Sequence, residues 1–108
     1  MKEKTIIRRA IKVLERLNWI TGSWFLKGPK SVSYQNCLEA DSCCLDGALL
    51  IAKRGGHYAL SDLNAARELI KTKASEKYNR SFQTIWQIND QAVHTKQDVI
   101  NVLKESLN

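Results

Sequence analysis

Apolar residues recur at the spacing of an α-helix in four segments of the chain, and this pattern most constrains its fold. Residues 5–17 place apolar side chains along one broad face and charges on the other side. Residues 42–54 are apolar around most of the circumference, so they are expected to form the central, most buried helix. Two further helices are predicted, over residues 61–78 and from Thr95 onward, with a short helical turn after Ser81.

Capping side chains mark the expected helix starts, and these are Thr5, Asp41 or Ser42, Ser61, Ser81 and Thr95. Thr95 and Asp98 form a capping-box-like pair. Gly47 lies inside the central helix, where glycine costs about 1 kcal/mol relative to alanine. We therefore expect a neighbouring helix or an aromatic ring to approach Gly47 closely.

Residues 18–36 break the helical pattern, because two turn signals, residues 21–23 and 27–30, enclose an aromatic cluster. The segment is interpreted as an ordered aromatic loop or a short hairpin over the core, and residues 31–34 alternate as a short strand would. A chain of 108 residues has room for one domain, since domains average about 150 residues. The predicted fold is all-α: a single helical domain, residues 1–108, with a small orthogonal bundle of four to five helices around residues 42–54.

The net charge of +6 is concentrated at one end of the chain. Residues 1–30 contain eight basic and two acidic residues, whereas residues 31–108 contain nine of each. Four cations fall on the outward side of the first predicted helix: Arg8, Arg9, Lys12 and Arg16. The expected partner is an acidic protein surface or a nucleic-acid backbone, although a charged helix face can also be merely solvated. The helix lacks Asn or Gln beside these cations, so any nucleic-acid binding is expected without strong sequence preference.

Aromatic side chains lie close to further cations in the irregular segment, where Trp24 and Tyr34 flank Lys27 and Lys30. This grouping is typical of a stacking platform for nucleic acid or of an anchor for a protein partner. The alternative is that its aromatic side chains, Trp19 and Phe25 in particular, cover the core. The predicted partner-binding residues are Arg8, Arg9, Lys12, Arg16, Trp24, Lys27 and Lys30.

The three cysteines, Cys37, Cys43 and Cys44, have no zinc-finger spacing, and we expect neither a metal site nor a cofactor. Cys44 at a helix start is a candidate activated thiol, with His57 or His94 as base and Asn89 or Asp90 as orienting group. The structural alternatives are a buried Cys44 packed beside Gly47, and a turn at residues 89–90 whose side chains cap neighbouring backbone groups, including the start of the last helix.

The longest unbroken apolar run is residues 49–52, so no segment is expected to cross a bilayer. Charges interrupt the N-terminal segment, and no secretory signal is expected there. Reduced thiols, at least one of them buried, are then the simplest reading of the cysteines. These features together predict a cytoplasmic protein.

Four motifs occur in a recognisable order, and they are Leu17–Gly22, the Cys-Leu-x-Gly-Ala-Leu box at residues 44–49, the Trp-x-x-Asn-Asp element at residues 86–90 and the helix start at residues 95–100. This order resembles a family of small bacterial and phage proteins of unknown function. The resemblance implies a compact, mostly helical domain and no particular activity.

These features together predict a non-catalytic protein that binds another macromolecule, most readily a protein. By analogy with the phage proteins that the sequence resembles, we expect a role between phage and host, such as inhibition of a host defence complex in the manner of an anti-CRISPR protein. The alternatives are a nonspecific nucleic-acid-binding protein and, third, a cysteine-dependent enzyme.

Overall fold

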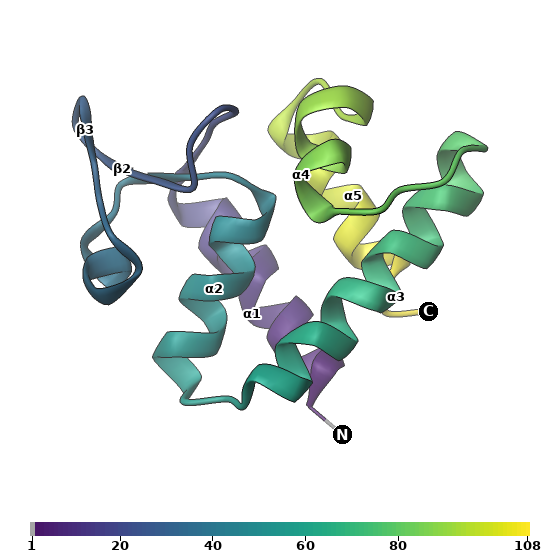
Figure 1. Cartoon of the computed structure of the whole chain (residues 1–108), viewed down its shortest axis with the longest axis horizontal. Coiled ribbons are helices and arrows are strands. Elements are labelled where there is room, and N and C mark those ends of the chain that lie inside the picture. The colour runs from purple at the N-terminus through teal and green to yellow at the C-terminus, as the bar shows by residue number, and fades with distance from the viewer. Residues whose placement is uncertain (1) are drawn as a thin grey trace.

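Helices form most of the computed structural model, which describes residues 2–108 (Figure 1). The α-helices in this range are α1 (Glu3–Arg16), α2 (Leu45–Gly56), α3 (Leu60–Tyr78), the short α4 (Ile85–Gln87) and α5 (Lys96–Glu105). The other helical turns are the 3-10 helix η1 (Tyr34–Glu39) and the π-helical η2 (Ile88–Ala92). The strands are β1 (Asn18–Trp19), β2 (Phe25–Lys27), β3 (Lys30–Ser31) and β4 (Ser42–Cys43).

The predicted all-α fold is wrong, because the aromatic segment and residues 42–43 form a small mixed sheet in the order β1-β4-β2-β3. Residues 42–43 were predicted as the start of the central helix, which instead begins at Leu45. Strand β1 runs parallel to β4, whereas β2 pairs antiparallel with both β4 and β3. The β2–β3 pair is a short hairpin, one of the two forms expected for this segment, and Gly28 in its turn has a positive φ of 59°. The chain is therefore mostly helical with a small β element.

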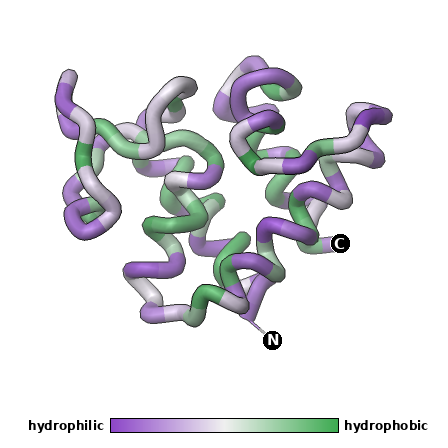
Figure 2. Tube along the Cα trace, viewed as in Figure 1, coloured by the Kyte–Doolittle hydropathy of each residue, from purple (hydrophilic) through white to green (hydrophobic). Residues whose placement is uncertain are grey.

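The hydrophobic core lies where α1 packs against α2, α3 and α5. Leu14, Leu45, Leu49 and Leu103 are fully buried there, and each such side chain contributes about 1.5–3 kcal/mol on leaving water. Hydrophobic residues concentrate along α2 and the segment that leads into it, whereas the tip of the hairpin is mainly hydrophilic (Figure 2). Within residues 2–108, no helix has the length and apolar character needed to cross a membrane.

The helix starts confirm one predicted cap and correct four others. Thr5 lies inside α1, which begins after Lys2 without a side-chain cap. Thr95 and Asp98 form the capping box of α5, as predicted. The cap of α2 is Cys44, whose Sγ accepts a hydrogen bond from the backbone N–H of Gly47 at 3.3 Å. The two predicted caps are otherwise engaged, because Asp41 accepts from Gly28 N–H and Ser42 lies in β4. Thr84 replaces Ser81 as the cap of α4, and α3 begins after Ala59 without a side-chain cap.

The close approach predicted at Gly47 is present. A Cβ atom placed on Gly47 would overlap the backbone oxygen of Trp24 and would lie 3.3 Å from the Phe25 ring. The same Trp24 oxygen accepts a hydrogen bond from the Cys44 N–H at 3.1 Å. The start of α2 is therefore fixed against the segment that carries Trp24.

Candidate functional site

A groove with a basic rim lies between α1, η1 and α2, and we call it the basic groove. It encloses about 360 Å³ and is lined by Arg9, Lys12, Val13, Arg16, Leu38, Ile51, Ala52 and Gly55. Three of these residues are exposed cations from α1, and the rest of the lining is apolar or glycine. No carboxylate lines it, so the groove combines positive charge with an apolar floor.

The cations of α1 have no acidic partner among residues 2–108, because none of the five ion pairs in that range includes one of them. Arg8 lies on the same helix face as Lys12 and Arg16, because residues four apart follow one another along one side of an α-helix. It does not itself line the groove. Arg9 is held in part by the Tyr58 ring, whose centroid lies 5.9 Å from the guanidinium carbon. The positive charge of α1 is therefore available to a partner.

The structure separates the other predicted site residues from this groove. Trp24 lines cavities with Asp46, Leu50 and Lys53 of α2, whereas the groove uses Ile51, Ala52 and Gly55. At 100° per residue these two sets lie on opposite sides of α2. Trp24 and the α1 cations therefore cannot belong to one small surface.

Lys27 and Lys30 lie on the β2–β3 hairpin and are not among the groove residues. Lys27 pairs with Glu39 at 3.7 Å, and both side chains are more than half exposed. An exposed pair of this kind contributes little to stability, about 1 kcal/mol at most. The predicted set of seven residues thus divides into an α1 group, a hairpin group and Trp24.

Sequence reasoning missed the apolar part of the groove. Leu38 is 55% exposed and comes from η1, a helix that the irregular segment did not predict. Gly55 lies near the end of α2, and its missing side chain keeps the groove open. The buried pair Ile51 and Ala52 was assigned to the core, and the periodicity could not show which edge of α2 would remain accessible.

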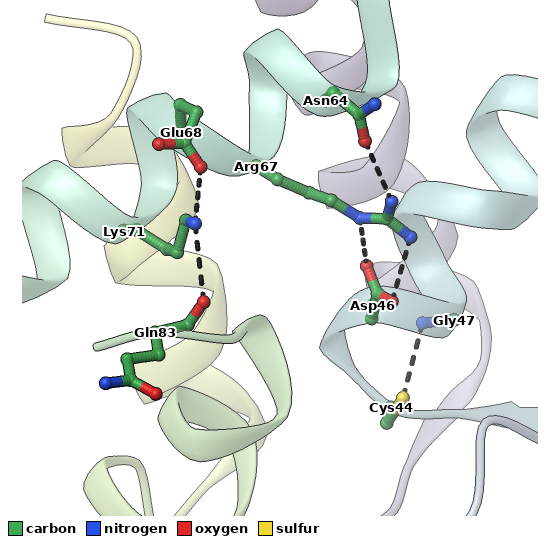
Figure 3. A network of polar contacts seen from close by, with 8 residues as sticks. All are labelled: Cys44, Asp46, Gly47, Asn64, Arg67, Glu68, Lys71 and Gln83. Carbon is green, nitrogen blue, oxygen red and sulfur yellow. Dashed lines mark hydrogen bonds and ion pairs between the residues drawn. The ribbon is translucent and has the colours of Figure 1, made fainter. Parts of the chain in front are cut away.

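A second surface surrounds Trp24 and Trp86, whose side chains are 59% and 50% exposed. A cavity of about 530 Å³ extends between them over α3. Figure 3 shows the polar contacts that build its wall: the guanidinium of Arg67 donates to both carboxylate oxygens of Asp46, at 2.9 and 3.0 Å. Lys71 pairs with Glu68 and donates to the backbone oxygen of Gln83. These contacts fix α3 to the start of α2 and to the segment that leads to Trp86.

Asn89 is a structural residue, as the capping interpretation predicted, although the helix it caps is α2 and not α5. Its side-chain oxygen accepts hydrogen bonds from Trp19 Nε1 at 2.6 Å and from Leu45 N–H at 2.9 Å. Its amide nitrogen donates to Ile20 O at 3.2 Å and to Asp90 Oδ1 at 2.8 Å. Residues 88–92 form the π-helix η2 in place of the predicted turn at residues 89–90, and η2 holds the buried amide between β1 and α2.

Cys44 has the properties of a buried thiol. Burial raises its pKa to about 11, and burial raises that of Cys43 to about 12. Since the thiolate is the nucleophile, a raised pKa works against covalent catalysis at neutral pH. His57 lies at the opposite end of α2, and no histidine lines the cavity that Cys44 borders. All three cysteines are free and buried.

The comparison with protein families gives one finding. The chain belongs to DUF6197, a family of unknown function, whose model matches residues 1–106. The comparisons with curated proteins and with solved structures give no match. Family membership therefore assigns no activity to the basic groove, and the origin in bacteria and phages stays a prediction.

Proposed function

We propose that this member of the DUF6197 family is a non-catalytic binding protein whose basic groove takes an acidic segment of a partner protein. The observation that carries the proposal is the composition of the groove. Arg9, Lys12 and Arg16 rim an apolar floor and have no acidic partner among residues 2–108. An acidic segment that also carries an apolar side chain would satisfy both parts of the groove at once.

The lining favours a protein over a nucleic acid. Single-stranded nucleic acid is held by aromatic rings on which its bases stack, and no aromatic residue lines the groove. Base readout uses Asn or Gln beside the cations, and these are also missing from the lining. Leu38 and Ile51 instead offer the apolar contact that a leucine or phenylalanine of a partner requires. Nucleic-acid binding is the outcome that would replace this proposal.

We also propose that the partner belongs to a host defence complex that acts against phages, such as a CRISPR effector. The support is the resemblance of the four sequence motifs to small bacterial and phage proteins. Occlusion of a functional surface on such a complex needs a binding face and no catalytic group. The raised pKa of the Cys44 thiol agrees with a non-catalytic role.

Charge reversal at the groove is expected to weaken binding of an acidic amphipathic peptide, built from Glu and Leu, by about 100-fold, because like charges then face each other. The variant combines Arg9→Glu, Lys12→Glu and Arg16→Glu, and fluorescence anisotropy of the labelled peptide measures the affinity. The control has the same change in net charge at three exposed cations outside the groove, and it combines Lys4→Glu, Lys30→Glu and Lys104→Glu. An equal loss in the control would show that the peptide responds to net charge and not to the groove.

A second variant blocks the groove without changing charge. A Cβ on Gly55 would lie 3.5 Å from the Arg9 guanidinium and 3.9 Å from Leu38, which is ordinary contact. Gly55→Leu should therefore fill the groove and abolish peptide binding while the protein stays folded. Gly55→Ala is its matched control and should bind normally. Unchanged binding by Gly55→Leu would place the peptide elsewhere.

A further inference from the structure

A small cavity between Trp24 and Trp86 differs in charge from the rest of this basic protein, and we call it the tryptophan pocket. It encloses about 290 Å³ and is lined by Gly22, Ser23, Trp24, Cys44, Trp86, Asn89 and Asp90. None of these seven residues is basic, although the chain has a net charge of +6. The charged group in the lining is the carboxylate of Asp90.

The Asp90 carboxylate is exposed and in no ion pair among residues 2–108. One of its oxygens, Oδ1, accepts a hydrogen bond from the Asn89 side chain at 2.8 Å, and this bond orients the carboxylate. Its negative charge reaches the pocket, where it contributes to the raised pKa of the Cys44 thiol. The carboxylate therefore retains accepting capacity toward a ligand in the pocket.

Two cations of the neighbouring cavity, which shares Trp24 and Trp86 with the tryptophan pocket, are already occupied. Arg67 is bound by both oxygens of Asp46, and Lys71 pairs with Glu68, as Figure 3 shows. Neither Arg67 nor Lys71 lines the tryptophan pocket. No ion pair within residues 2–108 therefore supplies Asp90 with a positive partner.

We propose that the tryptophan pocket binds an organic cation with N–H donors, a guanidinium or a primary ammonium group. The faces of indole rings attract cations, and tryptophan does so more strongly than the other aromatic residues. A carboxylate adds a charge-assisted hydrogen bond to the N–H groups of such a cation. The pocket shares no lining residue with the basic groove, so this inference stands independently of the acidic partner.

The test is a titration of the full chain, followed by tryptophan fluorescence, with ethylguanidinium chloride and with n-butylammonium chloride. We expect saturable binding with a dissociation constant on the order of 1 mM. NaCl at matched ionic strength is the control for salt effects. A fluorescence change that NaCl reproduces, or no saturation by either cation, would overturn the proposal.

Three variants then place the cation in the pocket. Trp24→Leu and Trp86→Leu should each weaken binding at least about fivefold, because each removes one indole face. Asp90→Asn keeps an oxygen for the Asn89 amide but removes the charge, and it should weaken binding by about tenfold. Glu15→Gln is its control, since Glu15 is exposed on α1, outside the pocket, and should leave binding unchanged. Equal losses in the Asp90 and Glu15 variants would refute the pocket as the binding site.

A small organic cation and an arginine or lysine side chain of a second protein present the same cationic group to the pocket. A comparison of probes distinguishes these two sources. N-acetyl-arginine amide and N-acetyl-lysine amide are titrated beside a short neutral-backbone peptide that carries one arginine. Tighter binding of the peptide identifies a polypeptide as the source, whereas equal affinity identifies a small cation. Failure of all of these probes to bind would contradict the proposal.

Discussion

Replacing Asn89 with alanine is expected to lower the free energy of unfolding by about 4 kcal/mol, a large part of the stability of a domain this size. The change leaves three buried or half-buried backbone and side-chain groups without their partner: Trp19 Nε1, Leu45 N–H and Ile20 O. Each unsatisfied group costs about 1–3 kcal/mol. Urea denaturation followed by circular dichroism measures the loss.

The control for Asn89→Ala is Gln91→Ala, two residues along the same π-helical turn. Gln91 is exposed, and its side chain accepts one hydrogen bond from Arg80. Its removal should change the free energy of unfolding by no more than about 0.5 kcal/mol. A loss at Asn89 that is no larger than the loss at Gln91 would show that water replaces the amide and that η2 does not hold β1 to α2.

The Gly47→Ala substitution is expected to destabilise the protein by about 2–3 kcal/mol, even though alanine favours helix formation by about 1 kcal/mol relative to glycine. The added Cβ would overlap the backbone oxygen of Trp24, the residue just before β2, and a backbone atom cannot move away as a side-chain end can. The hydrogen bond from Cys44 N–H to the same oxygen would be strained as well.

Gly55→Ala is the matched control, since Gly55 lies in the same helix and a Cβ there meets only ordinary contacts. It should raise the free energy of unfolding by about 0.5–1 kcal/mol, because the helix gains propensity without a clash. The diagnostic result is that Gly47→Ala lowers the free energy of unfolding whereas Gly55→Ala raises it. Stabilisation by both substitutions would mean that the approach of Trp24 to α2 is loose.

The helices could be predicted from the sequence because each buries a face whose apolar residues follow the helical period. The N-terminal helix was predicted at residues 5–17 and lies at Glu3–Arg16, and the capping box of Thr95 and Asp98 marks the start of α5. The close contact at Gly47 could also be predicted, because a glycine inside a helix costs stability that a close neighbour can offset. What approaches it is the backbone of Trp24 and the Phe25 ring.

The sheet and the composition of the site could not be predicted in the same way. Strands of two or three residues are too short to show an alternation of apolar and polar residues. In addition, β1 pairs with β4 across a long stretch of intervening chain. The charged face of α1 could be predicted from the sequence, but a groove also needs a second wall. That wall comes from Leu38 and Gly55, whose positions depend on how η1 and α2 pack. The same packing places Trp24 on the other side of α2.

Two surfaces of opposite charge therefore adjoin α2: the basic groove along the helix, and the tryptophan pocket with Asp90 at its N-terminal cap, Cys44. Both surfaces depend on the start of α2 being fixed against Trp24 and Asn89. The Gly47→Ala variant should therefore weaken binding at each surface only as far as it unfolds the protein. The Asn89→Ala variant should do the same at the basic groove, whereas at the tryptophan pocket it also removes the hydrogen bond that orients Asp90.

The central claim is that the basic groove binds an acidic protein segment by charge and apolar contact together. Anisotropy titrations at about 50 mM and about 200 mM salt test it most directly, with three labelled probes of equal charge. The probes are the amphipathic Glu–Leu peptide, a poly-glutamate peptide and single-stranded DNA. The amphipathic peptide should bind most tightly at both salt concentrations and lose the least affinity, because its apolar contacts are not screened. Equal or tighter binding of the DNA, or of poly-glutamate, would contradict the account.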